Sequence, residues 1–481
     1  MKRRSFALAG LALAATALGA RAQDAAPDWT LGYPSLAGDL APLPLAVRGR
    51  WPAELQGTLL RAGTGRHELG GFRYRHPFDG DGFIQRYTVA GGRIVHDGRF
   101  VRTPKYLADT AAGRPVRQAF ATVVPGAEPV RSADALNTAN TNVVAHGGEL
   151  LALWEGGSAT RLDPATLETR GFKAWSAETA GLPFSAHPRL EADGSLWNFG
   201  IASQAGRLVV WRADARGALL QHAVLAVPNV AMVHDFAITE RHLVFLLPPL
   251  VFERERVAAG ASFLDAHVWK PGLGLRVLVL PKDRLDAPQW LDLPAGFVFH
   301  VGNAWEQGGT IRLDYLRSPD AWHAMEGLKQ VLQGRHQPHD YAAVTTVQLD
   351  LARGRASQAV LPVVGEFPRI DPRLTGRRHR ELFLSARIDC EGRPGYDGVQ
   401  HVDLDGGAID RFHYGRHVMA EEHVVVPGRD RNWLVGTALD LRQKKMLLSV
   451  FDAGALAEGP VAQATLDRVL PLGLHASWVP G

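Results

Sequence analysis

The amino-acid sequence predicts an all-β protein built from many short strands. Apolar, strand-like segments recur along the chain, as at 150–154, 208–212, 242–247, 275–280, 310–315, 345–351 and 446–451. Most of them run into Gly, Asp or Pro turns, such as Asp163-Pro164 and Asp193-Gly194. The 51 Gly and 30 Pro are spread through all 481 residues, which favours turns over long helices. This pattern is compatible with a sandwich, a barrel or a propeller.

The composition is that of a globular protein with a large core, at 46% hydrophobic and 21% charged residues. The net charge of +4 is concentrated at one end. The first 22 residues contain four cations (Lys2, Arg3, Arg4 and Arg21) and no acid, so the remainder is formally neutral. A nucleic-acid partner therefore has no electrostatic support.

Residues 1–22 are predicted to be an export signal of the twin-arginine type, followed by one domain at 23–481. Paired arginines precede an Ala-rich apolar stretch, 7–20, which ends in the cleavage pattern Ala20-Arg21-Ala22. The stretch is short for a transmembrane span. A general secretory signal or a retained anchor is the alternative. We expect the mature chain in the periplasm.

Four histidines lie in separate apolar segments: His187, His234, His300 and His475. Imidazole nitrogen is a favoured ligand of Fe, Cu, Ni and Zn, and four imidazoles without a thiolate or carboxylate leave the full metal charge in place. Only a fold that brings distant strand ends to one axis assembles such a set. Taken singly, each is more often an ordinary core or surface histidine than a metal ligand. Three further histidines, His146, His242 and His379, lie in polar turns, and we expect them to be exposed.

Six motifs, in this order, resemble the carotenoid cleavage oxygenases, a family that includes stilbene-cleaving dioxygenases. The resemblance runs from about Leu40 to the C-terminus. The motifs are Phe78-Asp79-Gly80-Asp81-Gly82, Asn140-Thr141-Asn142, Leu153-Trp154-Glu155-Gly156-Gly157, His234-Asp235-Phe236, Glu366-Phe367-Pro368-Arg369 and Leu474-His475-Ala476-Ser477-Trp478.

The resemblance implies a seven-bladed β-propeller with a helical or loop cap over the iron face. Regions 252–269 and 321–333 are candidate cap pieces. The resemblance further implies that the four histidines (His187, His234, His300 and His475) bind one non-haem Fe(II) per chain on the propeller axis.

Three glutamates in the matching motifs, Glu155, Glu366 and Glu422, are implied to hold the outer nitrogens of these histidines. The alternative for each is a surface glutamate, although apolar flanks make an unpaired carboxylate costly. Glu421 adjoins Glu422, and His423 stands where the family usually has proline, so Glu421 is a second candidate for this role.

Thr141 corresponds to a family residue whose methyl group approaches the vacant iron position, where it limits coordination and steers dioxygen. An ordinary β-branched strand residue is the alternative. The implied reaction inserts both oxygen atoms across an alkene and yields two carbonyl products. We expect no organic cofactor, since the chain has no GxGxxG after a strand and no Walker sequence.

The expected substrate is a carotenoid or apocarotenoid, an apolar polyene, together with dioxygen. Stilbene cleavers hold a phenol through a Tyr and a Lys, and the nearest positions here are Phe100 and Arg114. A phenylalanine cannot hydrogen-bond a phenol, which disfavours stilbenes. A stilbene dioxygenase stays as the alternative enzyme of the same family. Alternatives of another functional class are a non-catalytic polyene-binding propeller and a zinc hydrolase. The apolar run 246–252 is either a membrane-dipping rim or a core strand with its turn.

Overall fold

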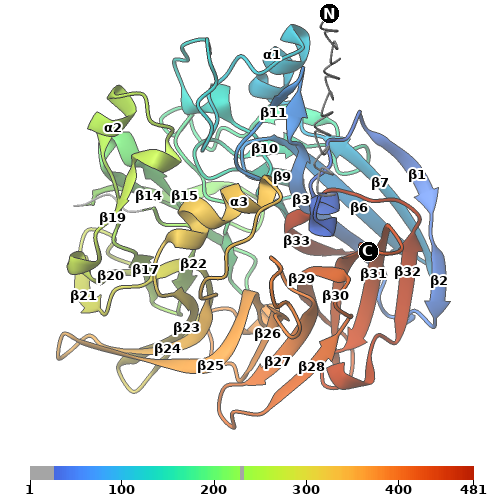
Figure 1. The fold of residues 1–481 in the computed structure, drawn as a ribbon. Coiled ribbons are helices and arrows are strands. Elements are labelled where there is room, and N and C mark those ends of the chain that lie inside the picture. Colours follow the sequence, from blue (N-terminus) through green and yellow to red (C-terminus); the bar gives the residue numbers. More distant parts are fainter. Residues whose placement is uncertain (1–25, 228–231) are drawn as a thin grey trace, which may run out of the picture.

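The computed structural model describes residues 26–227 and 232–481, and these residues form antiparallel sheets arranged around a common centre (Figure 1). The all-β prediction is confirmed. The export signal predicted at 1–22 lies outside the described residues. Within the described part of the chain, no helix combines the length and apolar character needed to cross a membrane.

The two ends of the described chain interlock in two five-stranded sheets. The last strand completes the first sheet, in the order β1-β7-β6-β3-β33, and an early strand completes the last, in the order β2-β32-β31-β30-β29. The bounds are β1 (Leu40–Pro44), β2 (Ala46–Gly49), β3 (Gly57–Arg66), β6 (Asp81–Ala90), β7 (Arg93–Phe100), β29 (Val418–Pro427), β30 (Asn432–Asp440), β31 (Lys445–Asp452), β32 (Ala462–Leu466) and β33 (Gly473–Pro480).

Three four-stranded sheets follow the first one along the chain. The first contains β8 (Asn142–His146), β9 (Glu149–Leu153), β10 (Thr160–Leu162) and β11 (Thr169–Phe172). The second contains β12 (Arg189–Leu190), β13 (Leu196–Ala202), β14 (Arg207–Ala213) and β15 (Leu219–Ala226). The third contains β16 (Phe236–Ile238), β17 (His242–Leu247), β20 (Leu275–Pro281) and β21 (Gln289–Leu293).

A seven-stranded sheet runs in chain order from β22 to β28. Its strands are β22 (Phe297–Gln307), β23 (Thr310–Ser318), β24 (Ala343–Asp350), β25 (Arg355–Arg369), β26 (Glu381–Ala386), β27 (Gly398–Asp403) and β28 (Ile409–His413). The long strand β25 pairs with β24 through 355–364 and with β26 through 365–369. Two short pairs complete the strands: β4 (Glu68–Leu69) with β5 (Phe72–Arg73), and β18 (Leu250–Phe252) with β19 (His267–Trp269).

The helical elements are short. They are α1 (Pro104–Ala112), α2 (Arg254–Ala258), α3 (Leu328–Leu332), the π-helical turn η6 (His323–Gly327), and the 3-10 turns η1 (Asp28–Gly32), η2 (Ala133–Leu136), η3 (Ser203–Ala205), η4 (Leu264–Ala266), η5 (Pro271–Leu273), η7 (Pro372–Leu374) and η8 (Leu456–Glu458). In Figure 1, α3 lies in front of the centre of the ring of sheets. The blade count of seven and the cap over the iron face stay predictions.

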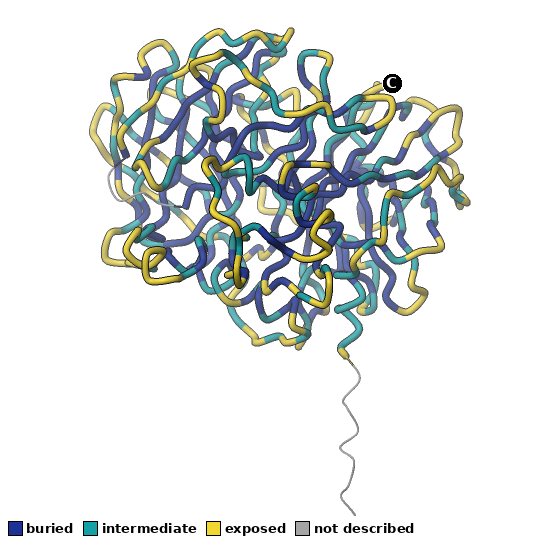
Figure 2. The backbone as a smooth tube through the Cα atoms, turned by 90° about the horizontal axis from the view of Figure 1, so that it is seen from above, coloured by how far each residue is buried: buried dark blue, intermediate teal, exposed yellow. Residues whose placement is uncertain are grey.

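The core lies between neighbouring sheets. Leu59 and Tyr87 of the first sheet pack with Val435 and Leu448 of the last, for example. Figure 2 shows buried backbone in the interior and exposed backbone mainly at the outer loops. The apolar run 246–252 belongs to this core, because Leu246, Leu247 and Leu250 are buried in β17 and β18. It is therefore a core strand with its turn, and a membrane rim at this run is wrong.

Candidate metal centre

The structure brings together His187, His234, His300 and His475, whose ligand atoms all lie within 4.8 Å of one another. Their Nε2 atoms face one another. The separations are 2.9 Å between His187 and His234, 3.3 Å between His234 and His300, and 3.3 Å between His300 and His475. A metal bound at about 2.1 Å would hold neighbouring nitrogens about 3.0 Å apart at right angles and about 3.4 Å apart in a tetrahedron. The spacing therefore fits one ion.

Local irregularities in the strands aim these side chains at the centre. His187 and His234 lie just before the short strands β12 and β16, while His300 lies in β22 where its pairing with β23 shifts register between Val298 and Val301. His475 lies in β33, whose pairing with β3 shifts between Arg61 and Gly63. A bulge of this kind re-aims a side chain without ending the strand, and such bulges are common beside active sites.

Glutamates occupy the outer nitrogens of three of the four rings. Nδ1 of His300 lies 2.6 Å from Glu366, and Nδ1 of His475 lies 3.2 Å from Glu422. Nδ1 of His234 contacts Glu155. Nδ1 of the fourth ring, that of His187, lies 3.9 Å from the carboxylate of Asp235.

This arrangement fixes the protonation of the rings. A ring that donates Nδ1–H to a carboxylate presents a lone pair at Nε2. Burial, followed by the neighbouring imidazoles, holds the pKa of His187 well below its ordinary value, and burial lowers the pKa of His475 to about 4. Two inward lone pairs cannot hydrogen-bond each other, so the close Nε2 contacts call for a cation between them. The donor set thus fits a divalent transition metal.

Glu422 is itself held by an arginine. Burial alone would raise the pKa of Glu422, but Arg369 and His475 outweigh burial and hold that pKa well below its usual range. Nε of Arg369 lies 2.9 Å from the Glu422 carboxylate, and its Nη2 donates to the carbonyl of Ala476 over 2.9 Å. Glu422, rather than Glu421, therefore contacts His475.

Arg189, which follows His187, hydrogen-bonds to the segments that carry His234 and His300. Its Nη2 donates to both oxygens of Asp235 at 2.8 Å and to the carbonyl of Val301 at 2.9 Å, and its Nε donates to the carbonyl of Phe236 at 2.8 Å. Asp235 in turn accepts from the backbone N–H of Phe236 and of Val301. The residues that adjoin His234 and His300 are thereby bonded to the strand that follows His187. Arg189 has no sequence signal of its own, since a lone arginine carries no motif.

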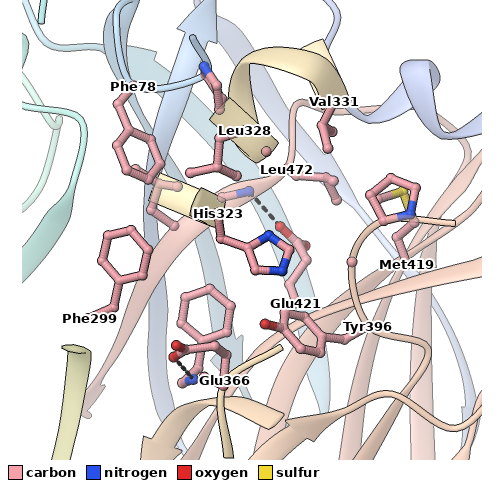
Figure 3. Close-up of a pocket in the computed structure, with 18 of the residues that line it drawn as sticks. Phe78, Phe299, His323, Leu328, Val331, Glu366, Tyr396, Met419, Glu421 and Leu472 are labelled. Atoms are coloured by element: carbon pink, nitrogen blue, oxygen red, sulfur yellow. Dashed lines mark hydrogen bonds between the residues drawn. The ribbon is translucent and has the colours of Figure 1, made fainter. Parts of the chain in front are cut away.

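Two cavities meet at the centre, and both are lined by Phe78, Thr141 and His234. The first also reaches His300 and His475, and its exposed wall is largely apolar. Figure 3 shows Phe78, Phe299, Leu328, Val331 and Leu472 around this first cavity, with His323 and Tyr396 projecting into it. The second extends past Phe120, Trp154, Met232 and Phe263. Thr141 is buried between them, and its Oγ1 donates to Oδ1 of Asn140 over 3.2 Å.

Several sequence-based expectations about side chains need correction. Neither Phe100 nor Arg114 lines these two cavities. Phe100 is buried against Tyr106 and Phe83, at 5.3 and 5.0 Å between ring centroids, and Arg114 is exposed. Of the histidines expected to be exposed, His146 and His379 are buried and His242 is partly buried. Nε2 of His379 lies 2.9 Å from Asp314, a partner far away in sequence that a local pattern cannot reveal.

Comparison with known proteins places this chain in one class. The family model described as RPE65, retinal pigment epithelial membrane protein, matches residues 36–480. The apocarotenoid-15,15'-oxygenase of Synechocystis sp. is 30% identical, with 94% of this chain and 96% of that protein covered. The lignostilbene-alpha,beta-dioxygenase isozyme III of Sphingomonas paucimobilis is 28% identical, with 92% and 94% covered.

Solved structures agree with the sequence relatives. The cobalt-substituted Synechocystis apocarotenoid oxygenase superimposes with a TM-score of 0.84 at 28% identity, covering 94% of this chain and 98% of that one. A chimera of the same enzyme with RPE65 also gives a TM-score of 0.84, at 26% identity and with the same coverage. The chain belongs to the RPE65 and carotenoid cleavage oxygenase family, and it is an oxidoreductase.

Proposed function

We propose that the chain is a non-haem Fe(II) dioxygenase that cleaves a carbon–carbon double bond of a carotenoid or apocarotenoid to two carbonyl products. The observation that carries this proposal is the convergence of four Nε2 atoms, three of them from buried histidines that line a cavity with a largely apolar wall. When bound, iron supplies the redox chemistry that activates dioxygen for insertion across an alkene. His187, His234, His300 and His475 would hold it.

The chain's own residues prepare this centre. Glu155, Glu366 and Glu422 accept the outer N–H of their histidines and so keep each inner lone pair pointed at one place. Apolar side chains such as Phe299 and Phe367 exclude water beside it and leave room for a flat, extended substrate. Thr141, at the junction of both cavities, is the residue that we expect to restrict the space left for dioxygen.

A polyene substrate is supported by the apolar wall and by the name of the apocarotenoid-cleaving relative. The stilbene alternative is kept because a relative is named as a lignostilbene dioxygenase and because the hydroxyl-bearing Tyr396 lines the first cavity. Phe100 no longer distinguishes a polyene from a stilbene substrate, since its ring does not line the described cavities.

The test is a combined metal and product analysis. The protein, purified with its native metal, is expected to contain one iron per chain and to convert a polyene under isotopically labelled dioxygen, with label in both carbonyl products. The panel contains carotenes, apocarotenals and 4-hydroxystilbenes. Cleavage of hydroxystilbenes alone would establish the alternative. Polyene binding without cleavage would indicate a binding protein, and zinc in place of iron would contradict the proposed metal.

We further propose that the chain is exported to the periplasm through residues 1–22, by the twin-arginine route. Paired Arg3 and Arg4 before an Ala-rich stretch support this. Replacing both arginines by lysine in the full chain is expected to retain the protein in the cytoplasm, as measured by cell fractionation. Unchanged export of that variant would favour a general secretory signal.

A further inference from the structure

Two adjacent carboxylates, Glu421 and Glu422, both reach the strand that carries His475. Neighbouring residues of a regular strand point to opposite faces. Here the pairing of β29 with β30 shifts register between Ala420 and His423, which frees the two intervening glutamates from this alternation. Both side chains are buried, at 4% and 2% exposure.

Glu421 is bonded on both of its oxygens. Its Oε1 accepts from Nη2 of Arg61 at 2.9 Å and from the backbone N–H of Gly473 at 2.5 Å, and its Oε2 accepts from the hydroxyl of Thr437 at 2.5 Å. Although it lines the first cavity, a carboxylate held by three donors has little capacity left for a ligand. Its contacts therefore indicate a structural role and not substrate binding.

The two glutamates accept hydrogen bonds from the backbone of β33 on either side of His475. Glu421 binds the N–H of Gly473, while Glu422 binds the N–H of Ala476 as well as the ring of His475. An arginine balances each charge: Arg61 for Glu421 and Arg369 for Glu422. Arg61 also links the two glutamates, because its Nη1 donates to the carbonyl of Glu422 over 3.1 Å.

Arg61 packs tightly against the backbone of Gly473. A Cβ atom at that position would lie 2.6 Å from Nη2 of Arg61, so the guanidinium packs directly against the strand. Arg61 is fully buried, and removal of one partner from a buried ion pair leaves an uncompensated charge. The pair can therefore hold 473–476 in one position with little tolerance.

We infer that Glu421 and Arg61 form a positioning pair that fixes His475 for metal binding, an inference that rests on the proposed metal function. The pair acts through the backbone of Gly473, whereas Glu422 acts through the imidazole itself. Loss of the Glu421 charge should loosen 473–476 and shorten the retention of the metal. The ring of His475 would keep its own carboxylate.

The test compares Glu421→Gln and Glu421→Ala with the matched control Asp109→Asn. Asp109 forms a fully buried pair with Lys105, 2.8 Å apart, in α1 and away from β33. We expect both Glu421 variants to release bound iron or cobalt to a chelator about tenfold faster than the native chain. We expect the control to lose thermal stability and yet keep the native release rate.

A second readout needs no metal. Amide hydrogen exchange over 474–478 in the metal-free protein is expected to be faster in both Glu421 variants and unchanged in Asp109→Asn. Native exchange in Glu421→Ala would overturn the inference, as would native metal release in the loaded protein. If the native chain took up no metal, the proposed function would fail, and the exchange measurement would still decide whether Glu421 fixes this segment.

Discussion

Oε2 of Glu366 lies 2.6 Å from Nδ1 of His300, and Nε2 of the same ring points at the other three histidines. One carboxylate on β25 thereby sets both the tautomer and the direction of a ring on β22. The same carboxylate oxygen accepts the N–H of Phe367, whose backbone adopts a positive φ of 57°. A left-handed non-glycine residue is uncommon and is maintained by its surroundings.

Glu366→Gln is expected to weaken metal retention by about 10- to 100-fold, because an amide no longer offsets the metal charge through His300. The measurement is the metal content after dialysis against a chelator. Glu306→Gln is the matched control, since Glu306 lies on β22, the strand of His300, and its Oε1 is 3.0 Å from Nδ1 of His242, away from the centre. Equal metal loss in both variants would contradict a specific role for Glu366.

Arg189→Met should lower the unfolding free energy of the metal-free protein by about 3 kcal/mol, because Asp235 is left buried without its partner. Urea unfolding measures this change. Arg353→Met removes the arginine of an exposed pair with Asp350 and is expected to change stability by less than about 1 kcal/mol. An equally small effect at Arg189 would show that the segments carrying the histidines are held by other contacts.

Thr141→Ala is expected to lower kcat/KM for the cleaved polyene about tenfold, since the space at the junction of the two cavities is no longer restricted. Thr141→Val keeps a β-branched methyl group and loses only the hydrogen bond to Asn140. We expect this variant to retain most activity. Steady-state kinetics with each variant make the comparison, and a greater loss in Thr141→Val would assign the role to the hydroxyl instead.

Phe100→Tyr is expected to bring no gain in hydroxystilbene binding. The ring is buried beneath Gly65, whose Cβ, if present, would lie 2.7 Å from it, so a new hydroxyl would be buried there. An unpaired buried hydroxyl costs about 1–3 kcal/mol. Thermal unfolding should register this loss, and ligand titration should show the native affinity. Tighter binding of a hydroxystilbene would place position 100 in the substrate path.

The metal-free protein should become less stable as the pH falls from about 6.5 towards 4. Burial, with a smaller contribution from Arg73, lowers the pKa of His67 to about 3, and burial lowers the pKa of His267 to about 4. Between these values and the ordinary pKa, the unfolded chain binds the extra proton. Stability therefore rises with pH in this window, by about 1.4 kcal/mol per pH unit for each group.

Urea unfolding at several pH values measures that slope. His67→Asn should reduce the slope by about 1.4 kcal/mol per pH unit, the contribution of one proton. An unaltered slope in His67→Asn would mean that this ring titrates normally in the folded state.

Much of the candidate site was predictable because its residues lie in recognisable motifs. His187, His234, His300 and His475 stand in apolar segments where an unsatisfied imidazole is costly, but only their joint context distinguishes them from ordinary core or surface histidines. The pairing of Glu366 with a histidine followed from the family motif, although the motif did not say which histidine. The choice between Glu421 and Glu422 stayed open, since both are carboxylates on one apolar strand.

The sequence by itself determined the all-β class, the histidine set and the family, because strand periodicity, turn residues and motif order are written along the chain. Only the tertiary structure decided that Glu422 meets His475, that Glu421 meets Arg61, and that Phe100 packs away from the described cavities. The two glutamate outcomes depend on the register shift in β29. A shift of one residue turns a side chain to the other face of the sheet, and what selects it is packing between segments far apart in the chain.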